Sequence, residues 1–187
     1  TWIVVDPRYS RSAARADIYA RIRPGSDLAF YGGLINYILQ NDLFQKEYVL
    51  HYTNAACLLR PDFKFDVDHG LFSGWDPETK RYDNETWGYD VDHKAVWDTS
   101  EGSAFAWVNR PGTPKFKTPD LKVLKRDMTL QDPNCVLNVM KRHYARYTPE
   151  LVTRVTGMDP DVMKKVWEVF ASTGRPDKAG SILYALG

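Results

Sequence analysis

The chain begins with an uninterrupted apolar run that ends abruptly at residues 6–8 (Asp-Pro-Arg). Such a run, bounded by turn-forming residues, is typical of a buried parallel strand that reaches the carboxyl edge of its sheet. A second turn follows at residues 25–27 (Gly-Ser-Asp), where the chain enters a segment with helical periodicity. In open α/β sheets, ligands bind outside the carboxyl ends of the strands. The two turns therefore predict an α/β fold with a ligand site at one edge of its sheet.

The first fifty residues alternate between strand and helix patterns. Either Ser26 or Asp27 is suited to N-cap the first long helix. The pattern predicts, in order, a strand at residues 2–5, a helical turn at 10–16, a strand at 18–22, and helices at 26–41 and 45–52. This β-then-α order predicts a doubly wound, mostly parallel sheet with flanking helices.

The middle of the chain has a different texture. From residue 54 to residue 132, aromatic residues are scattered among Pro, Gly and Asp without helical period. Stretches this long without regular structure are usually functional loops or decorations of a fold. We therefore expect a loop-rich, irregular aromatic insertion with a few short strands, within one α/β domain spanning residues 1–187.

Helical signals return after this insertion. Residues 135–147 are amphipathic, and two helices should start at residues 148–150 (Thr-Pro-Glu) and 159–161 (Asp-Pro-Asp), where a capping residue precedes a proline and an acid. Gly174 fits the C-cap of the second helix. Residues 181–186 have the composition of another buried strand. Because natural termini usually fray outside the core, we expect this chain to be a piece of a longer polypeptide.

Charge and composition exclude some classes of protein. The net charge of +1 gives no general attraction to nucleic acid, although the first 25 residues contain five arginines and no lysine. Arginine suits phosphate recognition, but surface solubility explains such a cluster equally well. No run of 18 apolar residues occurs, so no membrane span is expected. Cys57 and Cys135 have no metal spacing, which favours buried free thiols and leaves a disulfide open.

The two turns have the residue types that a nucleotide site needs. A phosphate at a sheet edge requires main-chain N–H groups and close approach of the backbone. Gly25 permits a positive φ at the second turn. Asp27 would repel a phosphate, so it is better suited to accept hydrogen bonds from a guanine edge or a ribose, the alternative being that it only caps its helix. The Gly-x-Gly-x-x-Gly fingerprint is absent, which disfavours an ordinary NAD site.

Other candidate chemistry is weaker. A near repeat, (Phe/Tyr)-Asp-Val-Asp-His, occurs at residues 65–69 and 89–93. Strand alternation would place Asp66 and Asp68 on one side and His69 on the other, so polar turns are expected rather than a metal chelate. No Gly-x-Ser-x-Gly elbow occurs. We assign no catalytic and no metal-ligating residue, and expect a chain that holds a ligand but lacks a reaction centre.

The two turns and several later blocks carry a family resemblance. Residues 4–17 and 22–29 closely resemble the molybdopterin oxidoreductase family. The later blocks look like the catalytic alpha subunit of respiratory formate dehydrogenases; these are residues 47–55, 70–74, 127–131, 146–150 and 182–187. The resemblance covers nearly the whole chain.

This resemblance implies the cofactor-binding portion of an enzyme that oxidises formate to carbon dioxide and two electrons. The cofactor implied is bis(molybdopterin guanine dinucleotide) carrying molybdenum or tungsten. In the family, the two turns contact one guanine dinucleotide. The implied positions are Asp6, Pro7, Arg8, Tyr9 and Ser10 at the ribose and phosphates, Gly25, Ser26 and Asp27 at the guanine end, and Leu186 and Gly187 as weaker candidates.

The resemblance also implies partners and a compartment. The partners are the rest of the catalytic subunit, with its 4Fe-4S cluster, together with an iron–sulfur beta subunit, and a cytochrome subunit. The compartment is the periplasm. Two alternatives stay open: the same superfamily acting on nitrate, dimethyl sulfoxide or a polysulfide, and a non-catalytic module that binds a nucleotide or a protein.

We predict that the 187 residues alone are catalytically inactive and bind the cofactor weakly. The family's cluster cysteines, its selenocysteine or cysteine metal ligand and its substrate arginine lie outside this sequence. A formate oxidation assay on the isolated polypeptide should therefore show no turnover, and measurable turnover would overturn the prediction.

Overall fold

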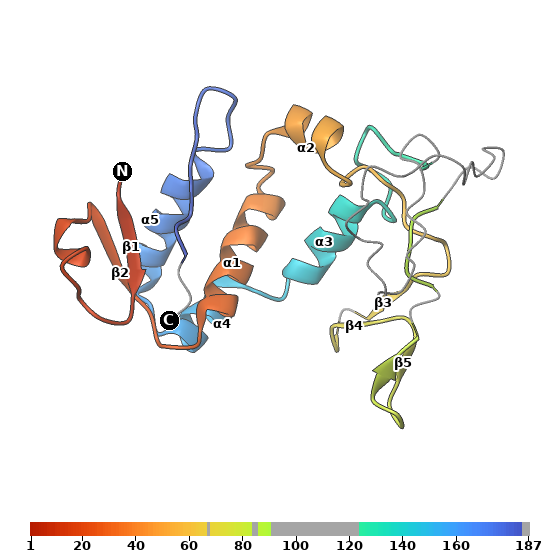
Figure 1. Cartoon of the computed structure of the whole chain (residues 1–187), viewed down its shortest axis with the longest axis horizontal. Coiled ribbons are helices and arrows are strands. Elements are labelled where there is room, and N and C mark those ends of the chain that lie inside the picture. Colours follow the sequence, from red (N-terminus) through yellow and green to blue (C-terminus); the bar gives the residue numbers. More distant parts are fainter. Residues whose placement is uncertain (67, 84–85, 91–123, 185–187) are drawn as a thin grey trace, which may run out of the picture. The chain divides into compact units, whose positions relative to one another are not determined.

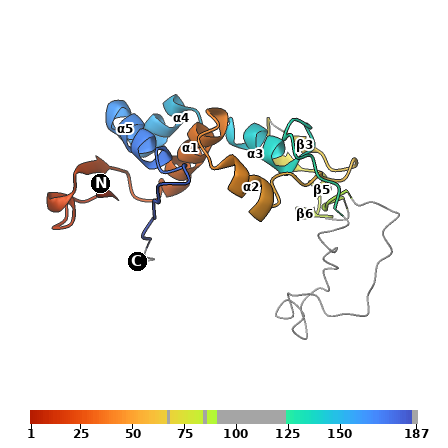
Figure 2. The same cartoon turned by 90° about the horizontal axis from the view of Figure 1, so that it is seen from above.

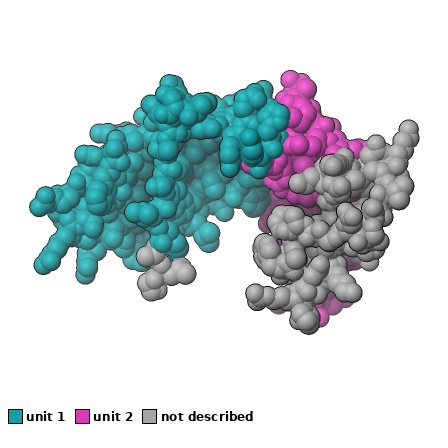
Figure 3. All heavy atoms as spheres, turned by 45° about the horizontal axis from the view of Figure 1, so that its top comes forward, with its two compact units in different colours: residues 1–52, 140–187 teal, residues 53–139 magenta. Residues whose placement is uncertain are grey.

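The structure is a computed structural model that describes residues 1–66, 68–83, 86–90 and 124–184 (Figure 1). The chain divides into two units, coloured separately in Figure 3. Unit 1 comprises residues 1–52 and 140–187, and unit 2 comprises residues 53–139. Both predicted turns lie in unit 1.

Unit 1 begins with a two-stranded parallel sheet. β1 (Ile3–Asp6) pairs with β2 (Ile18–Arg21), and the register joins Ile3 to Ile18 and Asp6 to Arg21. The connection between them contains a 3₁₀ helix, η1 (Ala13–Arg15). Both strands and the helical turn between them are confirmed. Because the pairing is parallel, the chain leaves both strands at the same sheet edge.

The described part of the chain contains five α-helices. Their bounds are α1 (Asp27–Gln40), α2 (Lys46–Tyr52), α3 (Val136–Tyr144), α4 (Pro149–Thr156) and α5 (Pro160–Ala171). The predicted caps are present: the hydroxyl of Thr148 accepts the N–H of Leu151 at 3.3 Å, and the Asp159 carboxylate accepts the N–H groups of Asp161 and Val162. Polar caps followed by proline thus locate the starts of α4 and α5.

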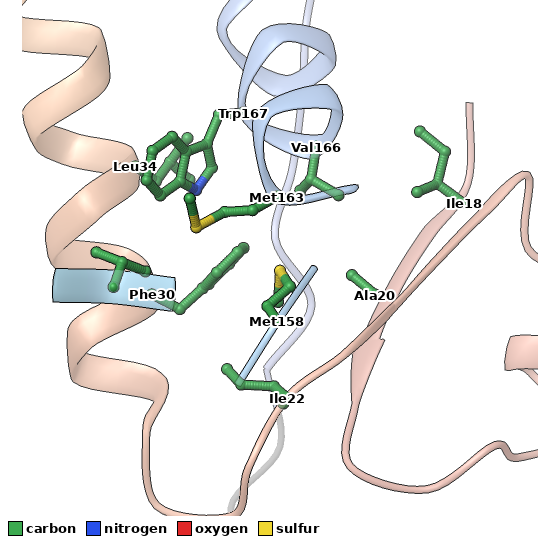
Figure 4. Close-up of a cluster of buried hydrophobic side chains, with 10 residues drawn as sticks. Ile18, Ala20, Ile22, Phe30, Leu34, Met158, Met163, Val166 and Trp167 are labelled. Carbon is green, nitrogen blue, oxygen red and sulfur yellow. The ribbon is translucent and has the colours of Figure 1, made fainter. Parts of the chain in front are cut away.

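The core of unit 1 lies between the sheet and three helices. α5 packs on β2, and α1, α4 and α5 pack on one another, as Figure 2 shows from above. Figure 4 shows the side chains that fill this space: Ile18, Ala20 and Ile22 in and after β2, Phe30 and Leu34 from α1, Met158, and Met163, Val166 and Trp167 from α5. Burying large apolar side chains of this kind contributes about 1.5–3 kcal/mol each.

The other face of the sheet is less covered. Val4 and Tyr19, which are paired in the register and point away from the core, are only half-buried. The described residues form three sheets of two strands each, one parallel and two antiparallel. The α/β class is therefore confirmed, whereas a doubly wound sheet is not formed by these residues themselves.

Two local predictions are wrong. Residues 181–184 form no strand: they pair with no neighbouring strand among the described residues, and Leu183 is 96% exposed. Gly174 is not a helix cap, because α5 ends at Ala171 with Ser172 as its C-cap. Its smallness serves packing instead, since a Cβ at Gly174 would lie 2.3 Å from the carbonyl oxygen of Leu43.

Unit 2 is built from short hairpins packed by aromatic rings. β3 (Phe65–Asp66) pairs with β4 (Leu71–Phe72), and β5 (Trp75–Asp76) pairs with β6 (Arg81–Tyr82). The ring of Phe72 contacts those of Phe63, Phe65 and Trp87, and Trp75 packs on Tyr82 with 4.9 Å between ring centroids. Short strands held by aromatics are what the sequence predicts for this stretch; residues 91–123 lie outside the described residues.

We predict that Gly33→Ala destabilises unit 1. A Cβ at Gly33 would lie 2.6 Å from ring carbon Cζ2 of Trp167 and 2.6 Å from a methyl of Val152, both of which are fully buried. Overpacking of this kind costs about 1–3 kcal/mol, more than the helix propensity that alanine adds. Urea unfolding of the chain measures this loss, with exposed Lys165→Ala on α5 as the control. Equal midpoints for the two variants would contradict the packing described.

We predict that Asp127 makes the stability of unit 2 sensitive to acid. Its carboxylate accepts the hydroxyl and N–H of Thr129 and the N–H groups of Gln131 and Asp132, which lower the pKa of Asp127 to about 2. Because an unfolded aspartate titrates at pH ~4, this stabilisation is complete above that pH and lost as the pH falls towards ~2. Asp127→Asn should remove this part of the acid sensitivity, which thermal unfolding at a series of pH values measures. Parallel curves for the two proteins would refute it.

Candidate nucleotide-binding site

The two sequence-predicted turns lie at one edge of the β1–β2 sheet. Residues 6–10 follow the last residue of β1, and residues 22–27 follow the last residue of β2, whose register partner is Asp6. Adjacent parallel strands lie about 5 Å apart, so the two turns start beside each other. The sheet pairing thus brings together segments that the sequence separates by some fifteen residues.

Hydrogen bonds from its own side chains and from Tyr19 of β2 hold the first turn. The carboxylate of Asp6 accepts the N–H of Arg8 at 2.7 Å, and the hydroxyl of Tyr19 donates to the carbonyl oxygen of Asp6 at 3.0 Å. The ring of Tyr9 packs edge-on against Tyr19, and the hydroxyl of Ser10 accepts the N–H of Ala13 at the start of η1. Pro7 and the side chains of Arg8 and Tyr9 remain exposed at this edge.

The second turn leads into α1 with its amide groups uncapped by a side chain. Gly25 has a φ of +75°, and no atom other than those of Gly25 and its chain neighbours lies within 4 Å of the position of a Cβ there. Ser26 occupies the N-cap position and is buried, but its hydroxyl donates to the carbonyl oxygen of Arg23 at 2.6 Å instead of accepting from the helix. Asp27 is the first residue of α1 and is exposed. Ser26 is therefore the N-cap residue of α1, and Asp27 is the acid of its first turn.

Four of the five N-terminal arginines are available to an anion. Arg8, Arg11, Arg15 and Arg21 are exposed and form no ion pair within the part of the chain that the structure describes. The two acids nearest in sequence accept main-chain N–H groups, Asp6 from Arg8 and Asp17 from Trp2. The fifth arginine, Arg23, is engaged with α4. Arg8 in the first turn and Arg21 at the end of β2 thus bring two exposed guanidinium groups to this sheet edge.

A third segment approaches the start of α1. Tyr31 lies one turn beyond Asp27, and its pKa is raised by burial, by the carboxylate of Asp27 and by the phenol of Tyr184. Tyr184 thus acts electrostatically on this part of α1. Leu186 and Gly187, the two weaker candidates, lie outside the described residues.

These features fit the end of a nucleotide chemically. An open helix N-terminus and exposed guanidinium groups favour phosphate, and a glycine with free space above it allows close approach. An exposed carboxylate accepts the N–H donors of a guanine edge. Groups that can bind a phosphate and a hydrogen-bond donor thus lie at one sheet edge, and within the described residues no nucleophile lies beside a base there.

The cysteines are not part of this site. Both are buried and free, as predicted, and burial raises the pKa of each thiol. An antiparallel bridge pairs Leu58 with Cys135, and residues next to each other along a strand point to opposite faces. Cys57 therefore faces away from Cys135, which disfavours a disulfide between them.

The first Asp-Val-Asp-His segment is a polar turn, as predicted. The carboxylate of Asp66 accepts the N–H groups of Asp68 and His69 and pairs with His69 Nδ1 at 2.8 Å, which raises the pKa of His69. His69 thus lies on the same side as Asp66, not opposite, because the strand ends at Asp66 and the chain turns. The second copy lies partly outside the described residues. Among the described residues, no group of three His, Cys, Asp or Glu side chains could hold a metal ion.

Comparison with known proteins places the chain beside one group of enzymes. No family model matches it. It is 38% identical over 187 residues to the alpha subunit of the formate dehydrogenase of Megalodesulfovibrio gigas, and 42% identical over 187 residues to the nitrate-inducible formate dehydrogenase major subunit of Escherichia coli K12. Each match covers the whole chain and 16% of the relative. A more distant relative is a sulfite dehydrogenase subunit of Allochromatium vinosum, 27% identical over 182 residues, which are 95% of this chain and 17% of the relative.

The matches therefore define a class first: the chain is homologous to part of an oxidoreductase subunit. More particularly, it is homologous over its whole length to one segment of the alpha, or major, subunits of formate dehydrogenases. The chain spans about one sixth of the length of these relatives. No helix of the described residues is both long enough and apolar enough to span a membrane.

Sequence reasoning missed the residues that shape the two turns. Tyr19 supports the first turn from the neighbouring strand, and Arg23 holds the second. The half-buried position of Tyr19 follows from strand alternation, which could have suggested it. The role of Arg23 depends on a helix more than 130 residues away, and no local pattern shows such a contact.

Proposed function

We propose that this chain forms the guanine dinucleotide-binding portion of a formate dehydrogenase catalytic subunit, and that its cofactor is bis(molybdopterin guanine dinucleotide) with molybdenum or tungsten. The similarity to formate dehydrogenase subunits over all 187 residues supports the class of enzyme. The observation that best supports the proposed site is the parallel register of β1 and β2, which sets both turns at one sheet edge.

Different residues of the two turns contact different parts of the proposed nucleotide. Asp6, Pro7, Arg8, Tyr9 and Ser10 form the proposed contacts to ribose and phosphates. Gly25 and Ser26 let the backbone approach, and Asp27 accepts hydrogen bonds from the guanine edge. Guanine presents two neighbouring N–H donors there, whereas adenine presents an acceptor, so a carboxylate favours guanine. Leu186 and Gly187 stay as weaker candidates.

The cofactor, when bound, supplies the metal at which formate is converted to carbon dioxide, a proton and two electrons. The role of this chain is to bind and orient the dinucleotide tail of that cofactor. Arg8 and Arg21, which are exposed at this sheet edge, neutralise its phosphates.

The proposal extends to the rest of the subunit. A parallel sheet is normally covered on both faces, and here Val4 and Tyr19 are only half-buried on one of them. We propose that β1 and β2 belong to a larger, doubly wound sheet of the whole catalytic subunit, into which residues 54–132 are inserted. The remaining proposed features are a periplasmic location, a 4Fe-4S cluster elsewhere in the subunit, an iron–sulfur beta subunit, and a cytochrome subunit.

The same superfamily includes enzymes that act on other substrates, and a sulfite dehydrogenase subunit is among the relatives. Its identity of 27% is well below the 38–42% of the formate dehydrogenases. Formate is therefore the better supported substrate.

We predict that Asp27→Asn and Arg8→Gln each weaken binding of GMP. The test uses the intact catalytic subunit purified without its cofactor, with binding measured by titration calorimetry. A hydrogen bond to a charged group is worth about 1.5–3 kcal/mol, so each variant should lose about tenfold or more in affinity. The loss for Arg8→Gln should shrink at high salt, because its contact is with phosphate.

Lys165→Gln, an exposed residue on α5 outside the site, is the matched control and should bind GMP as the unaltered subunit does. The unaltered subunit should prefer GMP to AMP. If neither Asp27→Asn nor Arg8→Gln changes the affinity, the site assignment fails.

A further inference from the structure

Arg23 stands out from the other N-terminal arginines because its guanidinium is already engaged. Its Nη1 donates to the carbonyl oxygen of Arg154 at 2.7 Å and to that of Val155 at 3.2 Å. Its main-chain N–H donates to the carbonyl oxygen of Thr156 at 2.8 Å. Arg23 therefore satisfies three consecutive carbonyl groups at the end of α4, which a helix leaves without partners of its own.

The same residue also holds the turn that leads into α1. The carbonyl oxygen of Arg23 accepts the hydroxyl of Ser26 at 2.6 Å and the N–H of Ser26 at 3.3 Å. Ser26 is buried and precedes Asp27, the first residue of α1. The polar main chain and side chain of Arg23 thus join the end of α4 to the proposed guanine-binding turn.

The backbone of Gly157 lies close against the guanidinium of Arg23. Gly157 follows α4 with a φ of +65°, and a Cβ there would lie 2.9 Å from Nε and 3.0 Å from Cζ of Arg23. The positive charge of Arg23 is also favourable at the carboxyl end of a helix. The guanidinium therefore meets both the carbonyl groups and the following glycine at the end of α4.

We infer that Arg23 is a positioning residue of the proposed nucleotide site, which holds Asp27 where its carboxylate meets a guanine edge. Arg23 does not itself touch the nucleotide; it acts through Ser26 and Asp27. The inference deepens the proposed function and rests on it. It also separates Arg23 from Arg8, whose proposed contact is with phosphate.

The test is the ratio of GMP affinity to AMP affinity in the intact catalytic subunit purified without its cofactor. Arg23→Met keeps the apolar stem and removes the donors, so Asp27 should lose its fixed position and the ratio should fall by about tenfold. Arg23→Lys keeps a charge but not the planar fork, and should restore part of the ratio. Lys165→Gln serves again as the control and should leave the ratio unchanged.

Gly157→Ala tests the same contact by changing the residue that follows α4 and leaving Arg23 unaltered. The added methyl should displace the guanidinium and lower the GMP-to-AMP ratio as Arg23→Met does. Combined with Arg23→Met it should add little, because both changes act on one contact. A thermal unfolding midpoint for every variant identifies those that remain folded at the binding temperature.

The outcomes separate the inference from the proposed function. If the unaltered subunit shows no preference for GMP, or Asp27→Asn does not reduce it, the proposed function fails. If the preference exists and depends on Asp27, but folded Arg23→Met and Gly157→Ala subunits keep the full ratio, Arg23 is only a structural residue and the inference is overturned.

Discussion

The parallel pairing of β1 with β2 is the interaction on which the rest of this molecule depends. Its register sets Asp6 beside Arg21, so the chain leaves both strands at one edge. Without that pairing, the Asp-Pro-Arg turn and the Gly-Ser-Asp turn would be two unrelated loops. With it, the turn that carries Arg8 and the start of α1 lie together at the carboxyl ends of two parallel strands, where open α/β sheets bind ligands.

The helices support this sheet edge by packing on β2 and by hydrogen bonding to the second turn. α5 covers the core face of β2, and the end of α4 is joined to the second turn through Arg23. The side chains that form these supports come from residues far apart in the sequence. A site of this kind is precise because it lies where packed elements end, with its polar groups held by hydrogen bonds to the backbone.

Local signals in the sequence predicted the elements that have local causes. Thr148 and Asp159 start their helices as expected, and the apolar run before Asp6 is a strand. The predictions that failed depend on neighbours that sequence does not specify. Residues 181–184 have strand composition but no partner strand among the described residues, and Gly174 is small because Leu43 lies against it. The same holds for the candidate site. The residues of its two turns could be predicted from the local sequence, whereas the supporting contacts of Tyr19 and Arg23 are tertiary and could not.

The proposed site is tested most directly by an experimentally determined structure of the intact catalytic subunit with its cofactor bound. We expect one guanine dinucleotide lying across the edge of β1 and β2, with the Asp27 carboxylate on the guanine base and residues 6–10 along the ribose and phosphates. A dinucleotide that touches only one of the two turns, or that lies away from this edge, would contradict the proposal.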